Sequence, residues 1–342
     1  MKKRILYTVL LAAGLAFSSC SDQFLQDMNP YDSYSPEKTF GIESNLDLYI
    51  QNVYYNYFYK SGMTPPQSYG LSGNWNDYST YTEEKWGIEK KFDASRSLKK
   101  ATDCETYFGS NLATNIKNDP YSRIRSCNEI LEGVDKYGQD LSEAAIKKAK
   151  GQAYFFRAFV YFNLIRSFGD VPYIDKPLNL TDVEDITRTP REEVYAKVMA
   201  DFDKAIEYLP EEWDAANTPR VTKGAALAMK ARAALYYNNW QVAADASKAV
   251  MDLGKYELYD AGNTGKYQEL FWEKSDGCDE NILYVQFNYP DKTHYLIGWE
   301  CFPTLGWGGM NPTQSLVDAF EDKDGAPISK STIYNEKDPV SY

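Results

Sequence analysis

One stretch, Tyr154–Phe168, is apolar on nearly every side of the helix that it predicts. It holds five Phe and two Tyr, and its strongly polar residues are Arg157, Asn163, Arg166 and Ser167. A helix that is apolar all round must be surrounded by other helices or by lipid. A bilayer span is excluded because the run is short and contains two arginines. We therefore predict a helix packed on all sides, whose arginines snorkel or pair with carboxylates and helix-end carbonyls.

The chain around this stretch predicts a helical scaffold over about 119–254. One helix begins at Ser35 and another at Asp119, each with proline at the first helical position. Both helices place apolar residues on one face, with the three- and four-residue spacing of an α-helix. These faces are Leu46, Ile50, Val53 and Tyr57 in the first helix, and Ile124, Cys127, Leu131 and Val134 in the second.

Further helix boundaries follow along the chain. The apolar helix is predicted to begin at Ser142 and to end at Gly169. The next helix has Thr189, Pro190 and Glu192 in the order of a capping box. In that motif the threonine and the glutamate bond free backbone amides at the helix start.

The segment 221–254 predicts two helices joined at Asn238–Asn239. Their facing positions are mostly alanine, and small residues let helix axes approach closely. We expect Tyr237 and Trp240 to act as aromatic plugs of this helix pair. Such helix pairs resemble tetratricopeptide repeats in style, without a strict repeat period. The facing alanines are Ala225, Ala228, Ala231, Ala243, Ala246 and Ala249.

The N-terminus predicts an export signal. A basic MKKR start precedes the apolar run Ile5–Phe17, and small residues lead to Cys20. The run is too short to span a bilayer as a stable helix. The pattern resembles a bacterial lipoprotein signal, with residues 1–19 cleaved, Cys20 lipidated and 20–34 as a tether. An ordinary signal peptide with a chance cysteine is the alternative.

Charge and aromatic content narrow the ligand class. The formal net charge is −12, which argues against nucleic acid because that binding depends on Lys and Arg neutralising phosphates. Aromatic residues make up 15% of the chain, with 29 Tyr and 7 Trp. They serve either as core and surface residues or as a face that stacks on flat ligands or sugar rings.

Cysteine usage leaves the redox state open. Cys104, Cys127, Cys278 and Cys301 remain beside Cys20. An exported protein can form disulfides, and four cysteines allow three pairings that sequence cannot choose among. A chain of this length does not need bridges, so we expect free, buried cysteines.

No metal or cofactor is expected. Structural zinc would need a Cys-x-x-Cys or Cys/His pairing, and none occurs. The acidic turns FEDKDG and SDGCDE are similar to calcium loops, but they lack the Asp-x-Asp-x-Asp-Gly spacing with a late Glu. Solvated turns are the simpler interpretation, and a weak Ca²⁺ site is the alternative.

Two loop-rich regions, 61–98 and 255–342, contain the candidate ligand residues. Sugar rings present an apolar C–H face that Trp and Tyr stack on, and their hydroxyls bond Asn, Asp, Gln and Arg. Both regions hold that mixture, although each aromatic could instead anchor its loop in the core. The candidates are Trp75, Asn76, Asp77, Tyr78, Tyr81 and Trp86 in the first region, and Tyr289, His294, Tyr295, Trp299 and Trp307 in the second.

Enzymatic activity is not expected. A Ser-His-Asp arrangement would have to use His294, the chain's sole histidine, and no Gly-x-Ser-x-Gly elbow is present. P-loop and dinucleotide fingerprints are also missing. A glycosidase would need two carboxylates about 5 Å apart, and 49 acidic residues make a chance pair uninformative.

The stretch AYFFRAFVYFNLIRSFGDVPYI resembles the signature helix of the SusD/RagB family. The matching positions are Arg157, Ala158, Tyr161, Phe162, Leu164, Phe168, Gly169, Asp170, Val171 and Pro172. Several later segments resemble the family in the same order, among them TPREEVYAKVMADFDKAIEYLP and GWGGMNPTQSLVDAFEDKDG. The resemblance runs from Cys20 to about Gly325.

The resemblance implies a fold and a function. Family members are lipid-anchored proteins of the Bacteroidetes outer membrane that cover a SusC-like TonB-dependent transporter and pass glycans or other nutrients to it. They are mainly α, with tetratricopeptide-like helices as scaffold, irregular ligand loops and little β. We expect 35–342 to form one such domain, shortened at its C-terminus, and no catalysis. The alternative is a helical adaptor lipoprotein that binds protein or peptide.

Overall fold

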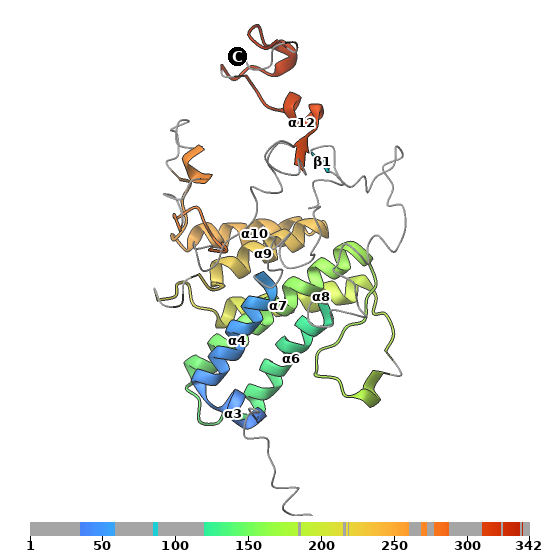
Figure 1. Ribbon diagram of the computed structural model, residues 1–342, viewed down its shortest axis with the longest axis vertical. Helices are drawn as coiled ribbons and strands as arrows, with labels where there is room; N and C mark the ends of the chain where they lie inside the picture. The colour runs from blue at the N-terminus through green and yellow to red at the C-terminus, as the bar shows by residue number, and fades with distance from the viewer. Residues whose placement is uncertain are drawn as a thin grey trace, which may run out of the picture.

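The protein is described by a computed structural model. The residues that it describes are 35–58, 85–87, 120–183, 186–214, 217, 219–259, 268–271, 277–286, 310–322, 324–335 and 337. This part of the chain is mostly helical and contains one two-stranded sheet (Figure 1). The prediction of a mainly α fold with little β is confirmed.

The element bounds are as follows. The α-helices are α3 (Pro36–Gly41), α4 (Glu43–Phe58), α6 (Pro120–Tyr137), α7 (Glu143–Phe168), α8 (Arg191–Tyr208), α9 (Lys223–Tyr236), α10 (Trp240–Asp252) and α12 (Gln314–Ala319). The strands are β1 (Lys85–Gly87) and β2 (Met310–Pro312), and the short 3₁₀ turns are η3 (Leu180–Val183), η5 (Gln268–Phe271) and η7 (Ile328–Lys330).

Helix α7 lies at the centre of the scaffold. It packs against α6 and α8, α8 packs against α9, and α9 packs against α10. Helices α3 and α4 close the N-terminal side by packing on α6, and α4 also contacts α7. Neighbours in sequence are therefore neighbours in space, which is the stack of helix pairs that the sequence predicts.

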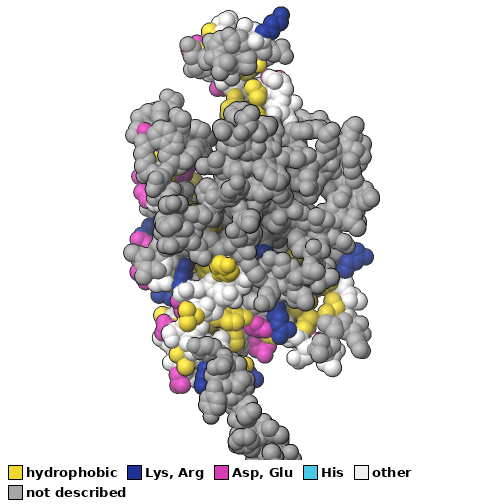
Figure 2. Space-filling view, in the orientation of Figure 1, with side chains coloured by type: hydrophobic (Ala, Val, Ile, Leu, Met, Phe, Trp, Pro, Cys, Tyr) yellow, Lys and Arg dark blue, Asp and Glu magenta, His cyan; other side chains and the backbone are white. Residues whose placement is uncertain are grey.

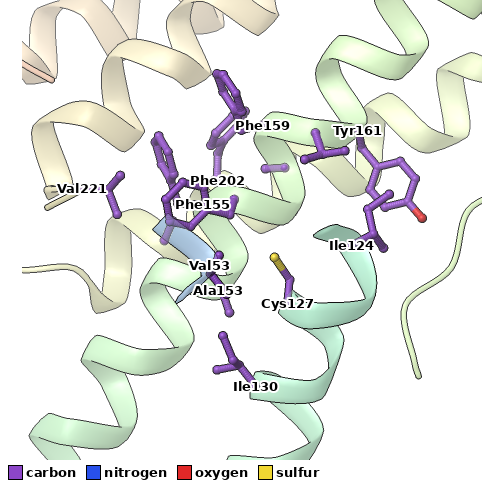
Figure 3. Close-up of a cluster of buried hydrophobic side chains, with 14 of the residues drawn as sticks. Val53, Ile124, Cys127, Ile130, Ala153, Phe155, Phe159, Tyr161, Phe202 and Val221 are labelled. Atoms are coloured by element: carbon purple, nitrogen blue, oxygen red, sulfur yellow. The ribbon is translucent and has the colours of Figure 1, made fainter. Parts of the chain in front are cut away.

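The core forms around the aromatic side of α7. All residues from 155 to 165 are buried, including Phe155, Phe156 and Phe162 at 1% exposure. Val53 of α4, Ile124 of α6 and Phe202 of α8 complete the cluster (Figure 3). Burying one such aromatic side chain contributes about 1.5–3 kcal/mol, so α7 is the main source of hydrophobic stabilisation. The prediction that the apolar stretch is packed on all sides is confirmed for residues 155–165, whereas Phe168 at the helix end is 40% exposed.

Several helix boundaries are confirmed. Ser35 Oγ accepts from the Lys38 amide at 3.4 Å, and Ser142 Oγ accepts from the Ala145 amide at 3.1 Å. Gly169 ends α7 with φ of 74°, a left-handed value that favours glycine. Asp119 lies outside the described residues, and α6 begins at the proline that follows it.

The prediction of a capping box at the start of α8 is wrong, because no side chain of that motif caps the helix. The amide of Arg191 donates instead to Asp170 Oδ1 at 2.9 Å. Thr189 Oγ1 accepts from the Tyr173 amide at 3.3 Å, and Glu192 pairs with the Arg191 side chain at 2.9 Å. The residue that caps α8 thus comes from the turn after α7, because Val171 forms an antiparallel bridge with Thr189 and brings the two segments together.

The structure of the α9–α10 pair confirms most of the predicted alanine contact and one of the two predicted aromatic plugs. Ala225, Ala231, Ala243 and Ala246 are buried, whereas Ala228 and Ala249 are half-buried. Tyr237 stacks on Tyr195 of α8 with ring centroids 4.2 Å apart, as an aromatic plug would. Trp240, the first residue of α10, is 62% exposed, so the prediction that it acts as a plug is wrong.

The predicted faces of α4 and α6 are also buried. Every residue named for them is at most 8% exposed. Cys127 and Cys278 are free, the first buried and the second half-buried. Cys104 and Cys301 lie outside the described residues.

Candidate functional site

Most predicted ligand residues lie outside the described part of the chain. Only Trp86 belongs to a described element, the strand β1. The predicted lipidation site, Cys20, also lies outside it. The others outside are Trp75, Asn76, Asp77, Tyr78, Tyr81, Tyr289, His294, Tyr295, Trp299 and Trp307.

The strand pair joins the two predicted loop regions. β1 comes from 61–98 and β2 from 255–342, and they pair antiparallel with Trp86 opposite Asn311. Strands β1 and β2 are far apart in the sequence, so this contact is a tertiary one. Backbone pairing between neighbouring strands fixes a separation of about 4.8 Å. The backbone of Trp86 is therefore held beside a strand that follows the second cluster in the sequence.

The strand pair continues into an ordered C-terminal element. Thr313, directly after β2, caps α12 by accepting from the Leu316 amide at 3.2 Å. α12 packs against η7, and β1 lies beside α12 at the end of the molecule opposite α3 (Figure 1). The sheet and α12 thus form a small body beyond the helical scaffold.

A buried ion pair fixes the scaffold beneath. Arg157 Nε and Nη2 donate to the two carboxylate oxygens of Asp201 at 2.8 and 2.7 Å. Arg157 Nη1 donates to Asn128 Oδ1 at 2.9 Å. Burial raises the pKa of Asp201, and the guanidinium opposes that rise. Burial also acts to lower the pKa of Arg157, but Asp201 more than offsets it and raises the arginine pKa.

The segment after α7 is tied to the scaffold by polar side chains of α6 and α7. Tyr161 Oη accepts from the Ile174 amide at 2.6 Å and donates to the Ile174 carbonyl at 3.1 Å. Asn128 Nδ2 donates to the carbonyls of Ile174 and Lys176 at 3.0 and 3.3 Å. Tyr161 and Asn128 thus hold the backbone of the segment after α7 against α6 and α7.

Arg166, near the C-terminal end of α7, also makes its contacts within the protein. Its Nη2 donates to Asn163 Oδ1 at 2.8 Å, and its guanidinium lies 5.3 Å from the centre of the Tyr236 ring. The expectation that an arginine of this helix pairs with a carboxylate is confirmed for Arg157. Arg166 bonds a side-chain amide oxygen instead.

The described residues contain neither a candidate metal site nor a candidate membrane-spanning helix. Among them, no group of three or more His, Cys, Asp or Glu side chains is placed to hold a metal ion. Within the same residues, every helix is too short or too polar to cross a bilayer. Asp322, in the FEDKDG turn, uses one carboxylate oxygen to accept from the amides of Asp324 and Ala326 at 3.0 and 2.9 Å.

A SusD-like family model, described as "Starch-binding associating with outer membrane", matches residues 23–235. That match covers more than half of the sequence. The chain belongs to the SusD-like family. The resemblance of the signature helix to this family is therefore confirmed.

Curated relatives agree with the family. SusD-like protein P2 of Formosa agariphila is 30% identical over 49% of this chain and 32% of its own length. A SusD-like protein of Bacteroides ovatus is 25% identical over 84% of this chain and 50% of its own length. The SusD-like chain thus spans about half, or less, of the length of these relatives.

Solved structures show the same fold. A SusD-like protein of Bacteroides fragilis matches with a TM-score of 0.67 and 25% identity, over 87% of this chain and 56% of its own. A SusD-like carbohydrate binding protein of the same species matches with a TM-score of 0.69 and 22% identity, over 87% and 57%. A laminarin binding SusD-like protein matches with a TM-score of 0.52 and 19% identity, over 70% and 50%.

Proposed function

We propose that this SusD-like chain captures oligosaccharide at the cell surface and delivers it to a SusC-like TonB-dependent transporter. Family membership supports glycan as the ligand, because the family description names starch binding and association with the outer membrane. Delivery to a transporter rests on the family resemblance of the signature helix and of the segments that follow it.

The observation that carries the location of the site is the pairing of Trp86 with Asn311. It joins one strand from each loop region at one end of the molecule (Figure 1). We propose that Trp75 and Trp86 from the first region, and Trp299 and Trp307 from the second, line one ligand face. Tryptophan rings stack on sugar faces, and neighbouring amides and carboxylates bond the hydroxyls.

The proposed role is binding without chemistry. The polar groups inside the signature helix are consumed by structural bonds, as Arg157 is by Asp201. Trp75, Trp299 and Trp307 supply ring faces but no acid, base or nucleophile. We propose that the protein needs no cofactor for this role.

The test of glycan binding is electrophoresis of the full chain, purified in detergent, through gels that contain starch, laminarin or another polysaccharide. Retardation in one gel would identify the glycan class. Replacing Trp75, Trp299 and Trp307 together by Ala should abolish that retardation. Trp240→Ala is the matched control, because Trp240 is an exposed tryptophan on α10, outside the proposed face.

Two results would redirect the proposal. Unchanged retardation of the triple variant, with a cooperative melting curve, would remove these tryptophans from the site. A wild-type chain that no polysaccharide retards, but that captures a peptide or protein, would favour the adaptor alternative.

The anchor is tested separately. We propose that Cys20 carries the lipid that holds the protein on the outer membrane. Labelling cells with an alkyne fatty acid should mark the wild-type chain, and Cys20→Ala should lose both the label and the membrane fraction. A Cys20→Ala chain that still sediments with outer membranes would contradict lipid anchoring at this residue. Co-purification of the wild-type chain with a TonB-dependent transporter would support delivery.

A further inference from the structure

A groove of about 630 Å³ lies at the N-terminal end of the scaffold, between α3, α4 and α6. Phe40, Tyr49 and Tyr137 line it with three aromatic rings, and Leu48 and Pro177 add aliphatic surface. The α6 residues that line it begin at position 129 and end at 137, which is about 12 Å along the helix axis. Its volume falls in the range of small-molecule sites, roughly 300–1,000 Å³.

Two glycines bring the walls of this groove together. A Cβ at Gly133 would lie 2.4 Å from the Phe40 ring, and a Cβ at Gly41 would lie 2.8 Å from the Tyr137 carbonyl oxygen. Glycine at both positions lets α3 lie against α6. The Phe40 and Tyr49 rings then meet edge to face, with centroids 5.3 Å apart. The aromatic lining is thus fixed before any ligand arrives.

One polar wall of the groove is held in place by hydrogen bonds to Glu129. Tyr49 Oη donates to Glu129 Oε2 at 2.6 Å, and Arg125 Nε donates to Glu129 Oε1 at 2.8 Å. Burial and the bond to Glu129 raise the pKa of Tyr49 above its ordinary value, so the hydroxyl stays protonated and donates. Both oxygens of Glu129 are already bonded.

Other polar groups at the groove remain available. Asn52 and Glu132 line it and are exposed, and among the described residues neither side chain makes a hydrogen bond or an ion pair. Lys136 lies over the Tyr137 ring, 4.9 Å from its centre. An amide, a carboxylate and an ammonium group therefore surround an apolar floor, with donors and acceptors both represented.

We propose that this groove is a second site for a short neutral oligosaccharide, distinct from the aromatic loops. The inference rests on the proposed function that the chain binds glycan. A sugar would place its C–H face on Tyr49, Tyr137 or Leu48, and its hydroxyls on Asn52 and Glu132. A partner helix fits less well, because its apolar face would desolvate these open polar groups without bonding them. Arg125 offsets the charge of Glu129, and Lys136 offsets that of Glu132, so the groove suits a neutral ligand better than an ionic one.

The groove and the strand pair lie at opposite ends of the molecule (Figure 1). Figure 2 shows hydrophobic side chains among acidic and basic ones at the end where α3, α4 and α6 lie. One short oligosaccharide cannot reach both places. Locating the peptides that a trisaccharide probe labels therefore distinguishes binding at the groove from binding at the loop regions.

The test uses the full chain in detergent and two probes, maltotriose and laminaritriose, each with a photoreactive diazirine. We expect cross-links in peptides of α4 and α6 that excess unmodified sugar removes. The triple variant Leu48→Ala, Asn52→Ala and Glu132→Ala should lower this labelling about tenfold or more. All three side chains are exposed, so the fold should persist. The matched control is Met251→Ala with Asp245→Ala on the exposed side of α10, which should change nothing.

Each outcome decides between the two sites. Competed labelling in α4 and α6 that falls in the triple variant supports the groove, with or without labelling of the loops. Competed labelling in the groove alone would also remove the aromatic loops from the proposed function. Labelling confined to 61–98 and 255–309 overturns the groove and leaves the proposed function standing. Labelling that competitor sugar never removes overturns the groove, and a glycan-retarded wild-type chain would still preserve the proposed function.

Discussion

Helices α7 and α10 belong to the same scaffold but use their apolar residues differently. In α7, apolar residues point to all sides, and Phe155 and Phe156 are 1% exposed. In α10, Ala243 and Val250 are buried on one face, while Trp240 and Met251 are 62% and 72% exposed. A helix at the centre of a stack has neighbours all round, and a helix at its edge has them on one side.

The difference explains where the family signature lies. Most matching residues of α7 are buried in the core, and Tyr161 also bonds the segment that follows. Asp170, just after α7, caps α8. These residues identify the scaffold because the scaffold depends on them. The signature stretch lies outside the two loop regions that we propose bind glycan.

The largest effect is expected at the buried ion pair. Arg157→Ala would leave Asp201 buried without its partner, so the free energy of unfolding should fall by about 3–5 kcal/mol. Urea denaturation measures this. The double variant Arg157→Met with Asp201→Leu is the control, and it should recover most of the loss because no charge stays buried. A loss below about 1 kcal/mol for Arg157→Ala would contradict the role of this pair.

The comparison of α7 with α10 is tested directly by two aromatic truncations. Phe155→Ala should cost about 3–5 kcal/mol through the lost transfer energy and the cavity that remains. Trp240→Ala should stay within about 0.5 kcal/mol of wild type, because its side chain is mostly in solvent already. Thermal and urea unfolding would measure the loss of unfolding free energy in each variant. Similar losses in the two variants would contradict the difference between a central and an edge helix.

A smaller effect is expected at the start of α8. Asp170→Ala removes the side chain that accepts from the Arg191 amide, and loss of such a cap costs about 0.5–2 kcal/mol. Glu192→Ala is the matched control and should cost less than about 0.5 kcal/mol. Should Glu192→Ala prove the more damaging change, the capping-box interpretation would be restored.

The smallest effect concerns acid stability. Arg220 donates to both oxygens of Asp47 and lowers the pKa of that carboxyl. A lowered pKa gives stability that is present above the unfolded value near 4 and is lost as the pH falls. Asp47 is 39% exposed, so Asp47→Asn should cost at most about 1 kcal/mol at pH 7. The difference from wild type should shrink as the pH falls below about 4 and should vanish below the lowered pKa of Asp47, whereas a constant difference would argue against the ion pair.

The sequence predicts the scaffold well because the relevant signals are local. Helical spacing of apolar residues identifies the buried faces of α4 and α6, and Ser142 and Gly169 bound α7 by contacts within a few residues. The capping of α8 escapes this reasoning because Asp170 reaches it through a tertiary bridge. Trp240 escapes it because helical spacing does not say which face of an edge helix meets solvent.

The candidate sites show the limits of pattern reading more strongly. The pairing of Trp86 with Asn311 joins segments that are far apart in the sequence, and no local pattern encodes its register. The groove between α3, α4 and α6 depends on Gly41 and Gly133 facing another helix. A glycine within a helix gives no sign in the sequence of what approaches it.

The central claim is that the two loop regions form a glycan-binding face on this scaffold. Tryptophan-fluorescence titration of the full chain, in detergent, with a panel of purified oligosaccharides tests it most directly. The account predicts a saturable shift with one class of glycan, which Trp75→Ala with Trp299→Ala removes and Trp240→Ala leaves intact. A protein that melts cooperatively and shows no shift with any glycan would contradict it.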